Sequence, residues 1–465
     1  MLRTSLALLA LLASAAPGFT QPISPEEQAK IDKLVTETLE KTKTPSASIA
    51  IVRGGELVLA KAYGKASEAI PVATPALPYQ IASNSKQFTA MALLLLEDEG
   101  KLDLDDKVSK YLPGISGGDR IALRQLLSHT SGLQDYWPQD FSFPAMATPT
   151  TPQHIIDIWA KKPLDCAPGT QWQYSNTGYV VAGQIVEKVA GEPLFSYLRT
   201  RIFRPLGMTS VIDMDKAIGP LFPQGYGRAA LGPVRVETPA APGWLYAAGE
   251  LSMTPADFAK WNIARINRAV LPADDWEEQE KSVKLIDGSD TGYGLGVNSR
   301  VSRGRRVISH GGESAGFLST NSVYPEQKAA ITVMTNTWSS GAYSQISRGL
   351  AEILLPPIAP DPVPTAHAAR VRALYDQLRT GKLDRKLLTA NASYYFTEAV
   401  TGDFRSSLAP LGPPASIEAQ GSPMLRGGFV IQNYLVKYSD RTLDLSVFME
   451  PGGNGRVEQF LVRGE

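Results

Sequence analysis

Strand-like patterns lie at both ends of the first 355 residues of this chain, and helical patterns lie between them. The two groups of strand patterns are residues 46–52 and 57–62, then residues 307–309, 317–323 and 329–335. The first group flanks Gly54-Gly55, which is typical of a β-hairpin. Because strands must pair, we expect both groups to join in one antiparallel sheet flanked by helices, with residues 123–261 inserted as a helical region. The expected fold class is α/β of the α+β kind.

Three helices can be placed from their end signals. Residues 24–27, Ser-Pro-Glu-Glu, combine an N-cap, a proline at the first helical position and a capping box, so a helix should run to about Lys41. A strongly apolar helix is expected from Ser83 to Gly100, because glycine commonly follows a helix end. A third is expected over residues 342–354.

A proline-rich segment separates two parts of the chain. Five prolines lie between residues 356 and 364, which predicts a stiff linker over residues 357–366. Residues 367–465 follow, with a helical pattern up to residue 379 and strand-like runs at 428–437 and 442–450. We expect a first domain over residues 21–356 and a small C-terminal α+β domain of unassigned role.

Residues 1–20 have the pattern of a secretory signal peptide. Arg3 supplies the positive end, an apolar run follows, and residues 13–15 are small enough for cleavage. That run is too short to span a bilayer, and no later apolar run is long enough. We expect an exported protein without a transmembrane segment, periplasmic or secreted, and the single cysteine, Cys166, suits a bacterial periplasm.

The charge balance argues against several partner classes. Lys and Arg number 46 and Asp and Glu number 46, so nothing favours nucleic acid or an anionic membrane. The four histidines lack metalloenzyme spacing, and we expect no metal or other cofactor. A small-molecule or peptide substrate is the expected partner, and the oligomeric state stays open.

The strongest chemical signal is Ser83-Asn84-Ser85-Lys86 at the start of the apolar helix. Residues three apart share a helix face, so the Ser83 hydroxyl and the Lys86 amine should meet. Serine needs a base to become a nucleophile, and a desolvated lysine with a lowered pKa can be that base. The motif is therefore a candidate acyl-transfer centre, although Ser-x-x-Lys alone is more often a solvated helix face.

Tyr174-Ser175-Asn176 is a second candidate stretch. A nearby ammonium would favour the phenolate of Tyr174, which could then act as a base beside a lysine. Asn176 could donate to a substrate carbonyl. The plain interpretation is a turn that starts a helix.

Two histidine-containing stretches complete the set. In His310-Gly311-Gly312-Glu313, the glycines would let backbone N–H groups approach a ligand and form an oxyanion hole, whereas the plain interpretation is the end of an edge strand. In residues 126–133, Leu-Leu-Ser-His-Thr-Ser-Gly-Leu, we expect His129 and the hydroxyls to bind backbone groups.

In this order, the motifs resemble the serine β-lactamase and penicillin-binding superfamily. The similarity is closest to the branch of class C β-lactamases, D-aminopeptidases, D,D-carboxypeptidases and β-lactamase-like esterases, and it covers about residues 27–356. Pro168-Gly169-Thr170, Pro205-Leu206-Gly207-Met208 and Tyr293-Gly294-Leu295-Gly296 are also typical of that branch.

The resemblance implies a serine hydrolase that cleaves a small amide, a peptide that can contain D-residues, or an ester. Ser83 would be acylated, and Lys86 and Tyr174 would form the proton-transfer pair. Asn176 would hold the substrate amide, and the N–H groups of Ser83 and Glu313 would form the oxyanion hole. Water activated at Tyr174 would then deacylate the enzyme.

One departure from the family pattern bears on the substrate. β-Lactamases and penicillin-binding proteins usually have Lys-Thr-Gly or Lys-Ser-Gly where this chain has His310-Gly311-Gly312. A histidine is often neutral near pH 7, so recognition of a β-lactam carboxylate should weaken. His-x-Gly is more similar to D-aminopeptidases and related hydrolases of the branch.

Other interpretations stay open at this point. Gly312-Glu313-Ser314-Ala315-Gly316 fits the Gly-x-Ser-x-Gly elbow of α/β-hydrolases, but the residues that follow read as a strand where a helix is needed. Cys166 could be a nucleophile, although a buried structural cysteine is the better interpretation. A true β-lactamase, or a non-catalytic or sensor-type module of the penicillin-binding kind, would share the fold.

Overall fold

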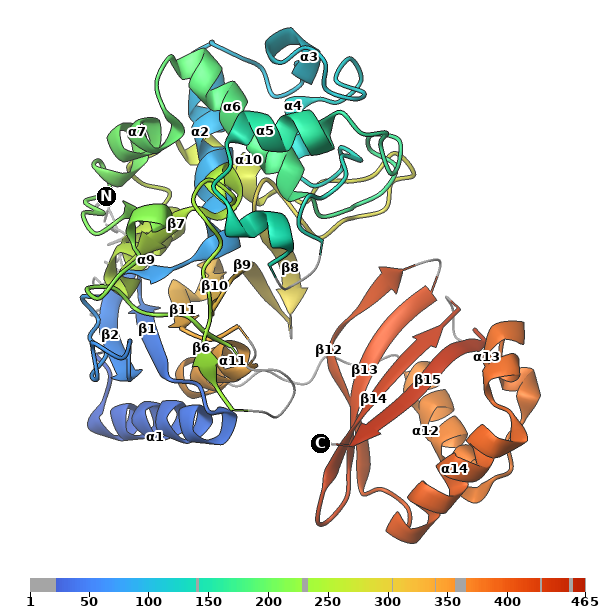
Figure 1. Ribbon diagram of the computed structural model, residues 1–465. Helices are drawn as coiled ribbons and strands as arrows, with labels where there is room; N and C mark the ends of the chain where they lie inside the picture. Colours follow the sequence, from blue (N-terminus) through green and yellow to red (C-terminus); the bar gives the residue numbers. More distant parts are fainter. Residues whose placement is uncertain are drawn as a thin grey trace, which may run out of the picture. The chain divides into compact units, whose positions relative to one another are not determined.

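The computed structural model describes residues 22–138, 142–227, 233–302, 304–338, 340–355, 365–426, 429–450 and 455–464. The expected signal peptide, and residues 357–364 of the expected linker, lie outside the described residues. The chain divides into two compact units (Figure 1), Met1–Arg300 with Arg306–Pro356, and Val301–Arg305 with Pro357–Glu465. No helix in the described part of the chain is long and apolar enough to cross a membrane.

A six-stranded sheet forms the centre of the first unit. Its strand order is β2 (Glu56–Gly64), β1 (Ser46–Arg53), β11 (Ala329–Thr335), β10 (Phe317–Tyr324), β9 (Arg305–Ser314) and β8 (Asn298–Ser302). The two ends of the unit meet where β1 pairs antiparallel with β11, Ile49 opposite Val333. The expected α+β fold, with a sheet built from both ends, is confirmed.

Strand β9 is longer than the sequence pattern predicted. It continues through His310 to Ser314, because Gly311 and Gly312 pair with Thr320 and Ser319 of β10. The two glycines are therefore inside the strand, and the polar residues that follow them sit at its end.

Helices cover both faces of this sheet. Ile49 of β1 packs in a cluster with α1 (Pro25–Thr42) and α11 (Ala342–Leu354), whereas Ala50 packs with α9 (Pro255–Asn267). The alternation follows from the two-residue repeat of a strand. Helix α1 has the predicted Ser24 N-cap and capping box, and α11 has the predicted bounds.

The segment between β2 and β8, which contains the expected insertion over residues 123–261, is mainly helical, and two of its longer helices are α2 (Lys86–Asp98) and α6 (Asn176–Ala190). Its other elements are α3 (Val108–Tyr111), α4 (Leu123–Leu127), α5 (Pro152–Ile155), α7 (Leu194–Leu198), α8 (Tyr246–Gly249) and α10 (Ala273–Glu280), with short strands β3 (Tyr79–Gln80), β4 (Ile212–Asp213), β5 (Tyr226–Gly227), β6 (Arg235–Val236) and β7 (Leu251–Met253). Helix α2 is buried from Lys86 to Leu96, which explains its apolar sequence.

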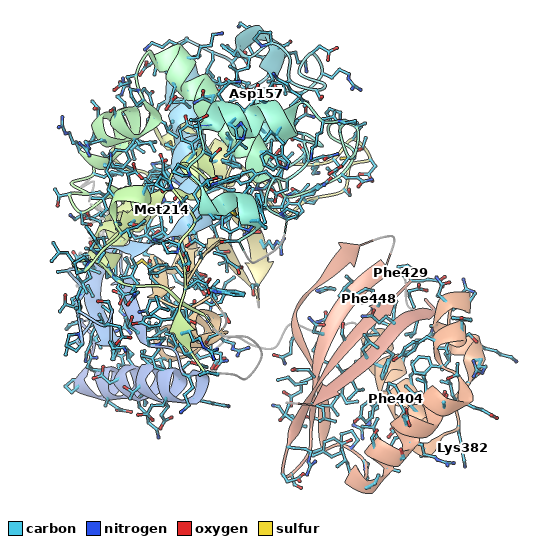
Figure 2. All side chains as sticks on the ribbon, in the orientation of Figure 1. Asp157, Met214, Lys382, Phe404, Phe429 and Phe448 are labelled. Atoms are coloured by element: carbon cyan, nitrogen blue, oxygen red, sulfur yellow. The ribbon has the colours of Figure 1, made fainter. Side chains whose placement is uncertain are left out.

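The second unit is a four-stranded sheet with helices on one face (Figure 1). Its elements are α12 (Thr365–Thr380), α13 (Ala390–Tyr395), α14 (Glu398–Leu408), β12 (Ser416–Arg426), β13 (Phe429–Lys437), β14 (Thr442–Met449) and β15 (Val457–Gly464). Tyr375 of α12 and Phe460 of β15 lie in its core, and Phe404 packs against that core (Figure 2). Because α12 starts at Thr365, the last two residues of the expected linker are helical.

Candidate active site

Ser83 lies at a sharp junction between strand β3 and helix α2. Residues Ala82–Ser85 form one 3₁₀ turn, in which positions three apart eclipse each other, and Ala82 has a left-handed φ of 46°. The junction is held by β7, because the Ile81 N–H donates to the Leu251 carbonyl at 3.0 Å. Ser83 is the only residue between 81 and 90 that is not fully buried, so its hydroxyl alone is presented to solvent.

Lys86 is completely buried and donates to three oxygen atoms. Its Nζ is 2.9 Å from Ser83 Oγ, 2.7 Å from Asn176 Oδ1 and 2.7 Å from the Ala248 carbonyl. Burial lowers the pKa of Lys86 to about 7, against a smaller opposing effect of the Asp135 charge. The amine is therefore close to half deprotonated at neutral pH.

The three partners determine where the lone pair of the neutral amine points. A carbonyl and an amide oxygen only accept hydrogen bonds, so both N–H bonds of the neutral amine are taken by Ala248 and Asn176. The lone pair then faces the Ser83 hydroxyl, which is the one partner that can donate. This is the geometry of a base aimed at a nucleophile.

Tyr174 contacts both Ser83 and Lys86. Its phenol forms a hydrogen bond with Ser83, and its ring centroid is 4.8 Å from Lys86 Nζ. Burial raises the pKa of Tyr174, which outweighs the effect of Ser83. The phenolate expected from the sequence is therefore wrong: the phenol keeps its proton at neutral pH, and Lys86 is the group that is available as a base at that pH.

Asp135 was missed by the sequence analysis. Its Oδ1 accepts from the Asn176 backbone N–H at 3.0 Å, and its Oδ2 accepts from Asn176 Nδ2 at 3.2 Å. These bonds fix the amide so that Oδ1 faces Lys86. Burial raises the pKa of Asp135, although the N–H groups of Trp137 and Asn176 oppose this. An acidic residue two positions after the Leu-Leu-Ser-His-Thr-Ser-Gly-Leu stretch was the available signal.

His129 supports the turn that carries Tyr174, as expected from the sequence. Its Nδ1 accepts from the Ser175 N–H at 3.1 Å, and its ring lies 4.1 Å from the Tyr174 ring. Burial lowers the pKa of His129 well below its ordinary value, so the imidazole is neutral. Ser175 in turn caps α6 by accepting from the Gly178 N–H.

Gly312 brings strand β9 against the nucleophile junction. A Cβ on this residue would stand 1.9 Å from the Ile81 carbonyl oxygen, so only glycine permits the approach. Gly311 and Glu313, on either side of Gly312, are exposed. Because Gly312 contacts Ile81, the Glu313 N–H belongs to a strand that lies against the residues before Ser83. This is the setting that an oxyanion hole needs.

His310 borders the site, but both of its ring nitrogens are occupied. Nδ1 lies 2.5 Å from the Gly311 carbonyl, so it carries the proton, and Nε2 accepts from the Tyr293 hydroxyl at 2.8 Å. Burial, followed by the Lys86 charge, lowers the pKa of His310 to about 4. The residue thus adds no positive charge at neutral pH.

The competing nucleophiles do not fit the structure. Ser314 is buried in the β9–β10 hairpin, where its hydroxyl donates to Gln80 Oε1 at 2.9 Å, and a strand follows it instead of a helix. Cys166 is half-buried instead of buried, and burial raises the pKa of its thiol. Within the described ranges, no three His, Cys, Asp or Glu side chains are arranged to hold a metal ion.

A cavity of about 500 Å³ adjoins the nucleophile junction. Gln80, three residues before Ser83, and Ala315, two residues after Glu313, line one side. The cavity therefore lies beside both strands that lead to the nucleophile junction, although Ser83 itself is not among its lining residues. Its other walls are largely apolar and include Ile218, Val236 and Phe317.

Comparisons with known proteins give the family of the chain. A family model described as Beta-lactamase matches residues 31–354. Penicillin-binding protein 4* of Bacillus subtilis is 28% identical over 337 residues, which cover 69% of this chain and 74% of that protein. The D-amino acid amidase of Ochrobactrum anthropi SV3, solved with D-phenylalanine, has a TM-score of 0.63 at 26% identity and covers 70% of this chain and 99% of its own.

A second solved structure extends the similarity in fold. The octameric penicillin-binding protein homologue from Pyrococcus abyssi has a TM-score of 0.63 at 22% identity, and the match covers 94% of this chain and 99% of that one. It therefore bears on the fold of nearly the whole chain.

Proposed function

The chain belongs to the beta-lactamase family and is a serine hydrolase of that family, and from this premise we propose that it cleaves amides and short peptides of D-amino acids through an acyl-enzyme at Ser83. The observation that carries the proposal is the neutral-amine geometry of Lys86, whose lone pair faces the serine. We also propose that the protein is exported, as its first 20 residues predict.

Acylation follows from the positions of three groups. Lys86 takes the Ser83 proton as Oγ bonds to the substrate carbonyl carbon, and the N–H groups of Ser83 and Glu313 receive the oxyanion. When the C–N bond breaks, the Tyr174 phenol gives its proton to the departing amine and takes one from the Lys86 ammonium. The acyl-enzyme then has a neutral lysine and a neutral tyrosine.

Deacylation runs the same steps with water. A water molecule in the place of the departed amine gives a proton to Lys86 by way of Tyr174, its oxygen bonds to the acyl carbon, and Ser83 recovers its proton as the ester bond breaks. No phenolate has to persist, which agrees with the raised pKa of Tyr174.

Two features favour an amine-bearing substrate over a carboxylate-bearing one. Asp135 is a half-buried carboxylate whose raised pKa would fall again next to a substrate ammonium. Neutral His310 supplies no fixed cation for a carboxylate. The similarity to the D-amino acid amidase supports the D-configuration, and the apolar cavity beside Gln80 suits the side chain of the acyl residue.

A labelling and turnover experiment tests the proposal. A fluorophosphonate should label Ser83, as mapped by peptide mass spectrometry, and D-phenylalanine amide should turn over at least tenfold faster than its L-enantiomer. Label on Ser314 would overturn the nucleophile assignment. No label, and no turnover of amide, ester or chromogenic cephalosporin, would instead indicate a binding module, and fast cephalosporin turnover a true β-lactamase.

The Asp135→Asn variant tests the role of the carboxylate. We expect kcat/KM for D-phenylalanine amide to fall at least tenfold more than kcat/KM for an acyl ester that lacks an amine. Because the Asp135 charge raises the pKa of Lys86, the acidic limb of the pH profile should also move to lower pH. Asp157→Asn, which alters an exposed surface pair with Lys161, is the control and should change neither quantity.

A further inference from the structure

Helices α6 and α8 approach each other more closely than any side chain on residue 183 would permit. A Cβ on Gly183 would stand 2.4 Å from the Ala247 Cβ and 2.7 Å from Cε1 of the Tyr246 ring. Both contacts are far below van der Waals separation. Gly183 lies inside a helix, where glycine is less favourable than alanine, so the close approach must compensate for that cost.

The single turn of α8 supplies backbone groups to helix α2. The Ala248 carbonyl accepts from Lys86 Nζ at 2.7 Å, and the Ala247 carbonyl accepts from Thr89 Oγ1 at 2.8 Å. The turn starts from a strained residue, because Tyr246 has a φ of 36°. The Tyr246 hydroxyl is anchored on α6 by Gln184 Nε2 at 3.0 Å.

One face of α6 therefore positions two of the three oxygen atoms that accept from Lys86, namely Asn176 Oδ1 and the Ala248 carbonyl oxygen. Asn176, at the start of α6, supplies one acceptor directly. Gly183 lies two helical turns further on the same face and seats the turn that supplies the other. Tyr179, between them, places its ring 5.3 Å from Lys86 Nζ.

From this arrangement we infer that Gly183 is a positioning residue for the catalytic base: its missing side chain sets the depth of α8, and α8 holds the Ala248 carbonyl that turns the Lys86 lone pair toward Ser83. The inference rests on the proposed role of Lys86 and adds a determinant outside the site.

A methyl group at position 183 has a defined consequence. To reach ordinary contact, α8 must retreat by about an ångström, which breaks the bond from Lys86 to Ala248. The neutral amine then has a free N–H, and its lone pair is no longer fixed. Loss of this hydrogen bond destabilises the ammonium more than the neutral amine, because charge-assisted hydrogen bonds are stronger. The pKa of Lys86 should therefore fall further.

The titratable groups near Lys86 that lie outside α8 are Asp135, His129, Tyr174, Tyr179 and His310. Tyr246 in α8 and Glu250 directly after it would move with α8, and burial raises the pKa of Glu250 to about 8. The pH profiles are therefore compared in a Glu250→Gln background, where a change on moving α8 reports the loss of the Ala248 carbonyl.

The test is Gly183→Ala in the full chain, with D-phenylalanine amide or a chromogenic ester as substrate. We expect kcat to fall on the order of 100-fold, as for other displacements of about 1 Å at a reacting group. The acidic limb of kcat/KM should move to lower pH. Adding Ala247→Gly to this variant removes the opposing methyl group. It should restore at least a tenth of the wild-type kcat and return the acidic limb of kcat/KM to its wild-type pH.

Two controls separate this effect from general damage. Gly402→Ala fills open space in helix α14, and Gly349→Ala meets only the flexible end of Leu34, so both should keep wild-type kcat. If Gly183→Ala does not fold, Tyr246→Phe serves instead, because it removes the hydroxyl that anchors α8 to Gln184 of α6 and should shift the acidic limb in the same direction.

The inference is overturned if folded Gly183→Ala keeps kcat and the acidic limb within twofold and about 0.2 pH units. It is also overturned if activity falls equally at every pH in step with the unfolded fraction. Failure of the proposed function looks different, because Lys86→Ala would then remain active while Gly183→Ala need not.

Discussion

Lys86 and Arg265 are two buried cations of the first unit. Lys86 belongs to α2, and the next residue of that helix, Gln87, contacts Arg265. Lys86 donates only to uncharged oxygens, and burial lowers its pKa to about 7. Arg265 of α9 is equally buried, but it lies 3.1 Å from the Glu280 carboxylate. Burial lowers the pKa of Arg265 only to about 10, because Glu280 opposes it.

The surroundings of Arg265 are built to keep its charge. Glu280 also accepts from Arg268 at 2.6 Å and from Arg306 at 3.0 Å. Burial alone would raise the pKa of Glu280, but Arg268 and Arg265 hold it below the ordinary value. The guanidinium lies near the rings of Trp261 and Trp276, and Gln87, next to Lys86, accepts one of its N–H groups at 3.2 Å.

The difference lies in the counter-ion. A buried cation with a carboxylate keeps its proton and acts as a structural tie, whereas one with neutral acceptors is able to release its proton. Arginine suits the first role because its guanidinium does not deprotonate, and lysine suits the second. Each of the following changes alters one side of this comparison.

The largest expected effect is that of Lys86→Met on catalysis. Without the base, kcat/KM for any substrate should fall about 10⁴-fold. The free energy of unfolding at pH 6 should rise by about 2 kcal/mol, because the cost of burying a charge exceeds the cost of two carbonyl oxygens left without a donor. Chemical denaturation with a matched kinetic assay measures both.

The pH dependence of that stability difference follows from the lowered pKa. Lys86 lowers the free energy of unfolding most below about pH 7, where the folded state must bury the ammonium. It has no such effect above the ordinary pKa of 10.5, where the amine is neutral in both the folded and the unfolded state. Lys188→Met is the control, since Lys188 donates to the Tyr111 carbonyl far from the chemistry and its loss should leave kcat within twofold. A Lys86→Met variant that keeps its activity would remove the basis of the comparison.

Glu280→Gln should instead lower the stability of the fold, because Glu280 is the counter-ion of Arg265. It leaves three guanidinium groups without their shared carboxylate, and breaking such a buried pair costs about 3–5 kcal/mol. Activity per folded molecule should stay within about twofold. In the control, Glu278→Gln removes a more exposed pair with Arg124 and should cost less than about 1 kcal/mol. Equal losses in the two variants would show that the counter-ion is not what holds Arg265.

The smallest expected effect is that of His310→Lys, which adds a fixed cation beside Lys86. The new charge would lack a buried carboxylate partner, so it should attract the carboxylate of a β-lactam and raise its affinity about tenfold. It should also move the acidic limb of the pH profile to lower pH, because like charges disfavour the Lys86 ammonium. Unchanged acylation by penicillins would contradict our account of the His-Gly-Gly segment.

Much of the local structure was predictable because its signals are local. The Ser24 cap, the Gly54-Gly55 hairpin and the helix after Ser83 each depend on residues a few positions apart. The longer course of β9 was not predictable, because its last residues extend only by pairing with β10. The bases and nucleophile were found in the same local way, from motifs with fixed spacing.

The motifs of the chain specify which side chains the site contains: a serine and an amine three residues apart, a phenol, and an amide two residues after it. How these groups behave depends on contacts between distant parts of the fold. The Ala248 carbonyl that orients Lys86 is a backbone group that any residue would supply, Asp135 meets Asn176 across 41 positions, and Gly183 acts by what it lacks. The pKa of about 7 that makes Lys86 a base arises from burial, and burial is a property of the packed molecule, not of any one residue.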